Sequence, residues 1–209
     1  MGDARDPGAD FGPIHPGTTI GHVHLKVADL DRALAFYCGV LGFELMQRFG
    51  PQAAFVSAGG YHHQIGLNTW ESLGGGPPAP GTTGLFHAAI LYPTRAALAD
   101  ALRRLIAAGI PLDGASDHGV SEALYLRDPD GNGVELYWDR PRDRWPRDRD
   151  GGIAMYTRRL DLEDLLAAKS LKVSGHRTVR GPRRKTPALS SPAWLAPRLI
   201  CFSKRYQPC

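Results

Sequence analysis

The sequence predicts an α+β fold made of two halves, residues 19–70 and 85–140, with the same βαβββ order of elements. Each half begins with a strand pattern, continues with an amphipathic helix and ends in three short strands. A Gly- and Pro-rich stretch, residues 71–84, separates the halves and reads as a loop. With 209 residues, 43% of them hydrophobic, the chain has enough apolar material for a core shared by both halves.

The first half opens with an alternating pattern over residues 19–27, which places His22 and His24 on one face of the expected strand. Asp29 suits the N-cap of a helix whose apolar residues recur at three-to-four spacing and which ends near Gly42. Three further strands are expected at residues 43–49, 53–58 and 62–68.

The second half repeats this order, with a strand over residues 85–92 and a helix over 95–108 that stops at Gly109. Its last three strands are expected at residues 112–115, 123–127 and 134–138. Before the last strand, Asp128-Pro-Asp-Gly-Asn-Gly has the composition of a tight turn. Residues 141–168 are expected to form an extension that packs on the domain.

The net charge of +4 hides an uneven distribution along the chain. Residues 169–209 carry ten of the 25 basic residues and no acidic residue, which leaves 15 basic against 21 acidic residues in the rest. This tail is rich in Pro, Ser and Arg and lacks alternating aromatic and basic residues. It therefore predicts disorder rather than nucleic-acid binding. Residues 1–18, rich in Gly, Pro and Asp, are expected to be a flexible lead.

Cysteine usage and hydropathy favour a cytoplasmic protein. The three cysteines are far apart in the sequence and suggest neither a zinc pair nor a disulfide framework. No apolar run approaches the roughly 20 residues that span a bilayer, and the first residues lack the apolar segment of a signal peptide. No membrane partner is expected.

Glu135 is a carboxylate within the apolar strand expected at residues 134–138. A buried carboxylate is costly unless it is paired or bound to a metal ion. His22 and His87 occupy corresponding places on the first strands of the two halves. Two imidazoles and one carboxylate form the ligand set of non-haem Fe(II) oxygenases and also suit catalytic zinc. His24 shares a face with His22 and is an alternative ligand.

Three segments together resemble the vicinal-oxygen-chelate superfamily, which contains glyoxalase I, bleomycin- and fosfomycin-resistance proteins and extradiol dioxygenases. The segments are Gly-His22-Val-His-Leu-Lys-Val, Phe-His87-Ala-Ala-Ile and Asp-Pro-Asp-Gly-Asn-Gly-Val-Glu135. The resemblance covers about residues 19–140. It implies paired βαβββ modules that form a cupped, partly open mixed-sheet barrel around a metal ion held by His22, His87 and Glu135.

Within the superfamily the chain is most similar to one-domain catechol 2,3-dioxygenases. That resemblance implies Fe(II), with Mn(II), Zn(II) or Ni(II) as alternatives, and an aromatic diol and O₂ as substrates. It implies His63 as the acid–base catalyst, and Tyr125 and His118 as groups that hydrogen-bond the substrate or oxygen. Adjacent His62 is expected to point to the opposite face from His63. Tyr125 has an alternative reading as a cross-strand packing aromatic.

Two other functions of the same fold stay open at this point. A glyoxalase-like lyase, isomerase or thiol transferase would use a fourth ligand, usually Glu, at the place of Gly66. Glycine has no donor there, although Gln64 on the same strand face is a possible substitute. A drug-binding resistance protein would not need an intact set of three ligands. Open sheet edges would also allow a homodimer.

Overall fold

The computed structural model describes residues 12–169, and the predicted basic tail beyond Lys169 and the first 11 residues lie outside the described part. The first half forms a four-stranded mixed sheet. In spatial order its strands are β1 (Val23–Lys26), β4 (Ile65–Asn68), β3 (Ala53–Ser57) and β2 (Glu44–Phe49). β1 runs parallel to β4, and the other pairs are antiparallel.

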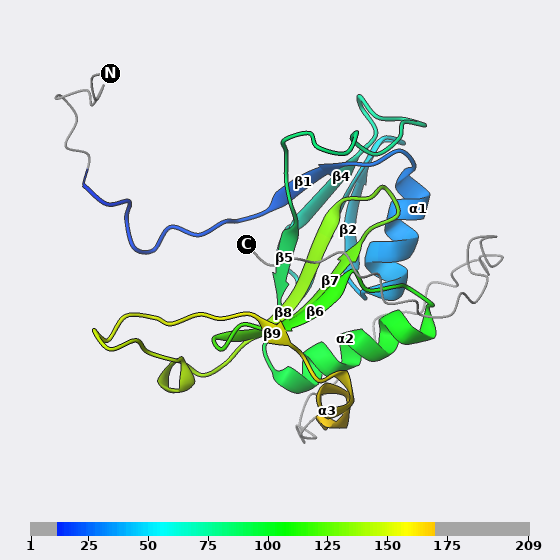
Figure 1. Ribbon diagram of the computed structural model, residues 1–209. Coiled ribbons are helices and arrows are strands. Elements are labelled where there is room, and N and C mark those ends of the chain that lie inside the picture. The colour runs from blue at the N-terminus through cyan, green and yellow to red at the C-terminus, as the bar shows by residue number, and fades with distance from the viewer. Residues whose placement is uncertain (1–11, 170–209) are drawn as a thin grey trace.

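The second half forms a five-stranded sheet with the same arrangement and one added strand. In spatial order its strands are β5 (Ala88–Leu91), β8 (Gly133–Asp139), β7 (Ser121–Arg127), β6 (Gly114–Asp117) and β9 (Arg158–Arg159). The predicted α+β class and the repeated βαβββ order are confirmed, and the two sheets do not close into a complete barrel (Figure 1). β9 lies in the extension and was not predicted.

Each half carries one principal helix after its first strand. The helices are α1 (Leu30–Leu34), which continues as the π-helical segment η1 (Ala35–Val40), α2 (Arg95–Ala107), the 3-10 turn η2 (Arg142–Arg144) and α3 (Leu162–Ala167). The Asp29 carboxylate caps α1 by accepting a hydrogen bond from Arg32 N, as its position predicts. Gly109, with φ +67°, follows the end of α2.

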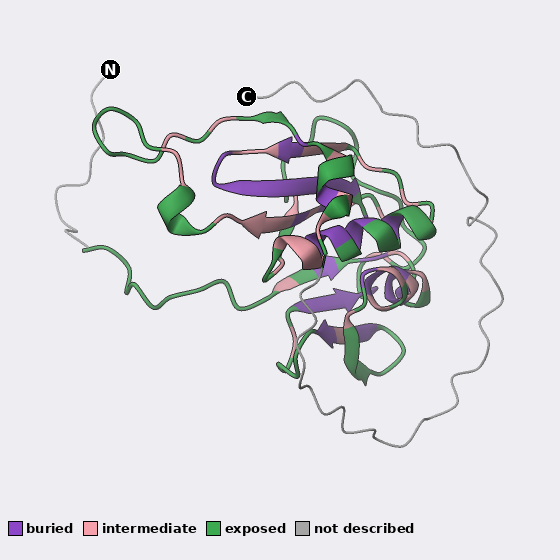
Figure 2. Ribbon diagram, turned by 90° about the horizontal axis from the view of Figure 1, so that it is seen from below, coloured by how far each residue is buried: buried purple, intermediate pink, exposed green. Residues whose placement is uncertain are grey.

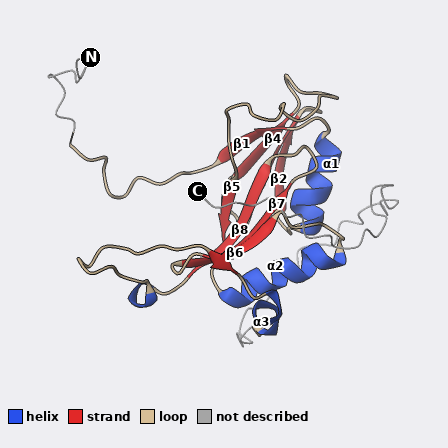
Figure 3. Ribbon diagram, viewed as in Figure 1, coloured by secondary structure: helices blue, strands red, loops and turns tan. Residues whose placement is uncertain are grey.

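A single apolar core joins the two halves. Figure 3 shows α1 and α2 on the same side of the strands, and Figure 2 shows buried segments in both sheets and helices. In β1, successive side chains point to opposite sides of the sheet: Leu25 is buried, while His24 is exposed. The core side is therefore apolar, and the opposite side carries the histidines. No helix among residues 12–169 is long and apolar enough to cross a membrane.

The predicted turn at residues 128–132 connects the halves. Asp130 Oδ1 accepts hydrogen bonds from Ala28 N, at 2.9 Å, and from the Arg32 guanidinium. Asp128 Oδ2 accepts a buried hydrogen bond of 3.0 Å from the Tyr37 hydroxyl. The turn thus fixes the start of β8 against β1 and α1 of the other half.

Candidate metal and catalytic site

Strand register relates the predicted ligands of one half to those of the other. Val23 pairs with Ile65 in the first sheet, and Ala88 pairs with Val134 in the second. His22 and His87 each directly precede the first paired residue of their strand. Gly66 and Glu135 each follow the first paired residue of the partner strand. The second half therefore offers a histidine and a carboxylate where the first half offers a histidine and a glycine.

In the second half the predicted residues converge on Glu135, whose side chain is 13% exposed. His87 Nε2 lies 2.9 Å from Glu135 Oε2. Tyr125, which pairs with Glu135 across β7 and β8, donates its hydroxyl to Glu135 Oε1 at 2.9 Å. Each carboxylate oxygen thus has a polar neighbour, the Tyr125 hydroxyl on one side and the His87 ring on the other, which offsets part of the cost of burying the group.

His118 extends this arrangement beyond Tyr125. Its Nε2 lies 2.7 Å from the Tyr125 hydroxyl oxygen. Because the single phenolic proton is donated to Glu135, the proton between the two rings belongs to His118 Nε2. His118 Nδ1 is 3.2 Å from Thr157 Oγ1, which can donate or accept, and 3.3 Å from the Tyr156 carbonyl oxygen, which can only accept. We call His118, Tyr125, Glu135 and His87 the hydrogen-bonded row.

Gly133 is a site residue that sequence reasoning treated only as part of a turn. A Cβ at this position would lie 1.9 Å from the Phe86 carbonyl oxygen and 3.0 Å from His87 Cα. Only glycine lets the chain entering β5 approach β8 this closely, and that approach brings His87 to Glu135. Thr157 was also missed, because it lies beside β9 in the extension, where no sequence pattern predicted a strand.

In the first half His22 and His63 are neighbours, with ring centroids 4.5 Å apart. The His63 ring also packs 4.9 Å from that of Phe55. Partial desolvation is the largest cause that lowers the pKa of His63, and the nearby His22, His62 and His24 lower it further. A lowered pKa favours the neutral imidazole, the form required of a general base.

The expectation that His62 and His63 point to opposite faces is wrong. Their Nδ1 atoms are 2.7 Å apart, so one ring donates a hydrogen bond to the other. The strand alternation behind the expectation does not apply, because β4 begins only at Ile65.

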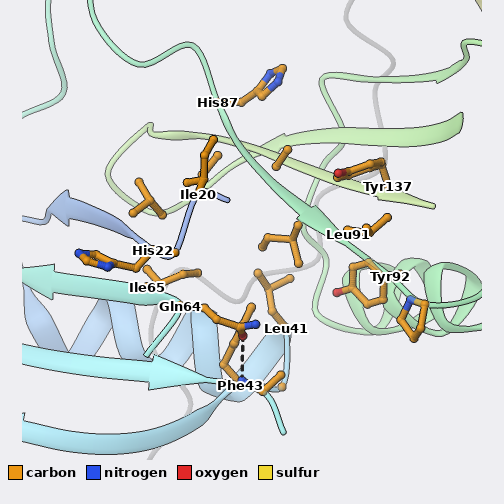
Figure 4. A pocket seen from close by; sticks show the side chains of 18 of the residues that line it. Ile20, His22, Leu41, Phe43, Gln64, Ile65, His87, Leu91, Tyr92 and Tyr137 are labelled. Atoms are coloured by element: carbon orange, nitrogen blue, oxygen red, sulfur yellow. Dashed lines mark hydrogen bonds between the residues drawn. The ribbon is translucent and has the colours of Figure 1, made fainter. Parts of the chain in front are cut away.

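The place of a fourth ligand at Gly66 is covered by another side chain. A Cβ on Gly66 would lie 2.9–3.0 Å from ring atoms of His24, which also packs beside Trp70. Burial, followed by His22, lowers the pKa of His24. Gln64 Oε1 accepts a 3.0 Å hydrogen bond from Ala58 N (Figure 4), so its oxygen is already engaged. This geometry does not favour Gln64 as a substitute ligand.

The donor types of His22, His87 and Glu135 suit Fe(II), but the three do not meet in this structure. Among residues 12–169 no three His, Cys, Asp or Glu side chains are grouped so that they could hold one ion. His22 and His87 line the same cavity, yet Figure 4 shows their rings pointing in different directions. His87 and Glu135 are in contact, and His22 would have to join them. The three-ligand set therefore stays a prediction.

Residues 19–136 match the family described as the Glyoxalase/Bleomycin resistance protein/Dioxygenase superfamily. The match covers more than half of the chain, so the chain belongs to this superfamily. A glyoxalase/dioxygenase from Nostoc punctiforme has a similar structure, with a TM-score of 0.51 at 19% identity over 62% of this chain and 98% of that one. That likeness concerns the fold.

Two relatives share more of the sequence. A catechol-2,3-dioxygenase of Bacillus subtilis (strain 168) is 46% identical over 154 residues, which are 73% of this chain and 53% of the relative. Biphenyl-2,3-diol 1,2-dioxygenase 3 of Rhodococcus globerulus is 36% identical over 122 residues, 57% of this chain and 63% of the relative. The chain thus matches between half and two thirds of the length of these relatives.

Proposed function

We propose that this chain catalyses metal-dependent extradiol cleavage of a catechol-type substrate with O₂. The observation that carries the proposal is the hydrogen-bonded row from His118 through Tyr125 and Glu135 to His87. It joins two predicted ligands to two polar side chains expected to act on the substrate or oxygen. The names of the two dioxygenase relatives support the same reaction class.

The proposed metal ligands are His22, His87 and Glu135, and Fe(II) is the proposed ion. When bound, the ion supplies a Lewis acid for the diol and a redox centre for O₂. The contact between His87 Nε2 and Glu135 joins two of these ligands, although the rotation of His22 that would complete the set is part of the proposal.

The protein's own side chains supply proton transfer and orientation. His63, whose lowered pKa favours the neutral imidazole, would accept a phenolic proton from the diol and return it to the product. The Tyr125 and His118 pair would orient the diol or the oxygen by hydrogen bonds to their oxygen atoms. The ring bond beside the two hydroxyls breaks, and both atoms of O₂ enter the product, a muconic semialdehyde. No other reactant is consumed.

The glyoxalase-like alternative would need a donor at the position of Gly66. The His24 ring covers that position, and the Gln64 oxygen accepts a backbone hydrogen bond. A drug-binding role would not require the polar contacts of the hydrogen-bonded row, whereas ring cleavage would use them. We therefore favour ring cleavage over both alternatives.

The test is anaerobic loading with Fe(II), followed by addition of a catechol and then oxygen. We expect a yellow ring-cleavage product and oxygen uptake equal to the substrate consumed. Absence of product with several substituted catechols, in protein shown to contain iron, would reject the proposal. Activity toward a glutathione hemithioacetal in protein loaded with Zn(II) or Ni(II) would instead support the lyase alternative.

A further inference from the structure

His118 lies in a turn rather than in a strand, so the sheet alone does not fix the direction of its side chain. β6 ends at Asp117 and β7 begins at Ser121. His118 N donates a 2.9 Å hydrogen bond to Ser121 O, which holds the backbone of the turn. The imidazole is half-buried, and its Nε2 side meets the Tyr125 hydroxyl. The contacts on its Nδ1 side therefore decide whether the ring stays against Tyr125.

A segment of the extension, residues 145–159, covers the Nδ1 side, and we call it the covering segment. Figure 1 shows this part of the chain running out from the sheet and returning to it at β9. Tyr156 N donates to His118 O at 3.3 Å. Tyr156 O and Thr157 Oγ1 lie 3.3 and 3.2 Å from His118 Nδ1. Packing on the edge of the sheet would need the backbone contact but not the two contacts to the ring.

Gly119, the next residue, lets the covering segment come this close. It is buried and has φ +78°. A Cβ there would lie 2.6 Å from Tyr156 Cε1 and 2.9 Å from Pro146 Cγ. These two side chains therefore occupy the space that a larger residue would need. The turn after His118 is thus shaped to receive the covering segment.

The covering segment is anchored near both of its ends. At one end β9 pairs with β6. The Arg158 guanidinium carbon lies 4.3 Å from the centre of the Tyr156 ring, a cation–π contact that helps to hold the ring in place. Near the other end the Trp145 indole N–H donates a 2.7 Å hydrogen bond to Arg140 O. The contacts to His118 are therefore made by an anchored part of the chain.

We propose that Thr157 is a positioning residue, whose hydroxyl, together with the Tyr156 backbone, holds the His118 imidazole against Tyr125. This inference rests on the proposed dioxygenase function, in which His118 hydrogen-bonds the diol or the oxygen. It assigns a role in the reaction to residues 145–159, which lie beyond the residues 19–136 that match the family. Thr157 acts through His118. Without its hydroxyl, one contact to Nδ1 remains in place of two, and the ring is less often in position.

The first test compares Thr157→Val, which removes the hydroxyl at nearly constant volume, with Thr157→Ser, which keeps it. In iron-loaded protein, Thr157→Val should lower kcat by about three- to tenfold, the effect of one neutral hydrogen bond, and leave KM within about twofold. Thr157→Ser should restore kcat. Thr18→Val, at an exposed position of the N-terminal lead, is the matched control. An unchanged kcat in Thr157→Val, or a Thr157→Ser equally slow, would overturn the proposal.

A second pair of variants displaces the covering segment. Gly119→Ala adds a methyl group in the space of the Tyr156 ring, whereas Gly109→Ala adds one where nothing lies within 4 Å. Both glycines have positive φ, +78° and +67°, so the backbone strain of the two substitutions is similar. Only Gly119→Ala should lower kcat, because only it moves the segment away from His118. Equal kcat in the two folded variants would overturn the proposal. Melting curves and circular dichroism identify variants that fail to fold.

The nuclear magnetic resonance spectrum of the His118 ring is a readout that needs neither iron nor turnover. His118→Gln identifies the signals by their loss. The unmodified protein, Thr157→Ser and Thr18→Val should share the same ring-nitrogen shifts. They should also share contacts between the rings of His118 and Tyr125, whose centroids lie 6.3 Å apart. Thr157→Val should change the Nδ1 shift and weaken these contacts.

The outcomes distinguish the positioning role from the proposed function. Ring signals and kcat that change together in Thr157→Val and return in Thr157→Ser would support both. Cleavage of a diol at the same kcat by all Thr157 variants would overturn the positioning role and leave the dioxygenase standing, whether or not the ring signals change. No cleavage of any diol by iron-loaded protein would overturn both.

Discussion

The Tyr125 hydroxyl contacts both Glu135 and His118, and it donates its single proton to the carboxylate. Since Tyr125 donates to the carboxylate, His118 must donate from Nε2. Thr157 Oγ1 and the Tyr156 carbonyl oxygen both lie near His118 Nδ1 and hold the other side of the ring. The row thus places an imidazole and a phenol, each engaged in a hydrogen bond within the row, beside a proposed metal ligand. These groups are held in place before any substrate binds.

Tyr125→Phe should reduce turnover by about 10²-fold, the lower range of acid–base contributions, while iron content stays near that of the unmodified protein. The change removes the hydroxyl that links His118 to Glu135 but keeps the ring and its packing. Tyr156→Phe is the control, because it removes a nearby phenol outside the row and keeps the backbone oxygen that lies 3.3 Å from His118 Nδ1. Steady-state kinetics and metal analysis provide the readouts. Loss of iron in Tyr125→Phe would show that the tyrosine positions Glu135 rather than acting on the substrate.

Asp128 has a raised pKa, and its burial is the largest cause; hydrogen bonds from Asn132, Tyr37 and the Asp130 backbone lower the pKa in part. The folded pKa therefore lies above the ordinary value of 3.8. A group with a raised folded pKa contributes stability that is fully present below its unfolded pKa. That contribution is lost as the pH rises through the folded pKa.

The free energy of unfolding of the protein minus that of Asp128→Asn should therefore be largest at acid pH and should fall toward neutral pH. Urea unfolding of both proteins across this range measures the difference, and the other titrating groups cancel between them. A difference that instead grows with pH would mean that the hydrogen bonds to the carboxylate outweigh its burial.

At the scale of elements, short strands and their turns place the proposed site. The turn at residues 128–132 ties β8 to the first half, and β9 brings Thr157 beside His118. β5 and β8 meet where Gly133 leaves room for the chain at Phe86 and His87. The position of His87 against Glu135 thus depends on a glycine two residues before the carboxylate.

Gly133→Ala should lower the free energy of unfolding by about 1–3 kcal/mol or more, because the added methyl overlaps the Phe86 carbonyl and forces the strands apart. It should also weaken iron binding, since His87 moves away from Glu135. Gly114→Ala is a matched control in β6 of the same sheet, where an added Cβ meets nothing within 4 Å. Denaturant unfolding and iron titration measure the two effects. Equal stability of the two variants would show that the strands adapt to the methyl group.

At the scale of the whole molecule, the sequence predicts the order of the elements better than their mutual geometry. Period-two and three-to-four patterns predict the repeated βαβββ halves, since each pattern reflects burial on one face. β9 is not predicted from the sequence, because its residues, Arg158 and Arg159, form a strand only by pairing with β6. The hydrogen bond between His62 and His63 likewise depends on a loop conformation that local alternation does not describe.

For the site, the sequence predicts which residues take part but not the distances between them. Tyr125 and Glu135 come together because β7 and β8 pair in a fixed register. The pairing of β5 with β8 brings His87 beside them, and His118 follows β6, which pairs with β7. His22 belongs to the other sheet, so its approach depends on how the two halves pack and on its rotamer. Neither is encoded in a local pattern. A shared metal ion would couple the two sheets, and that coupling can be measured.

Fe(II) should raise the melting temperature of the protein, and a chelator should reverse the change, because an ion bound by both halves stabilises only the folded state. At a hundredfold excess over Kd the gain is about 2.7 kcal/mol. His22→Ala, His87→Ala and Glu135→Gln should each abolish most of this gain. His24→Ala should retain it, because His22 is the proposed ligand of the first half and the His24 ring packs over Gly66. Calorimetry with and without iron measures the shift.

If His24→Ala loses the gain and His22→Ala keeps it, the first-half ligand is His24. If only His87→Ala and Glu135→Gln lose it, the ion is held by the second half alone and does not join the sheets.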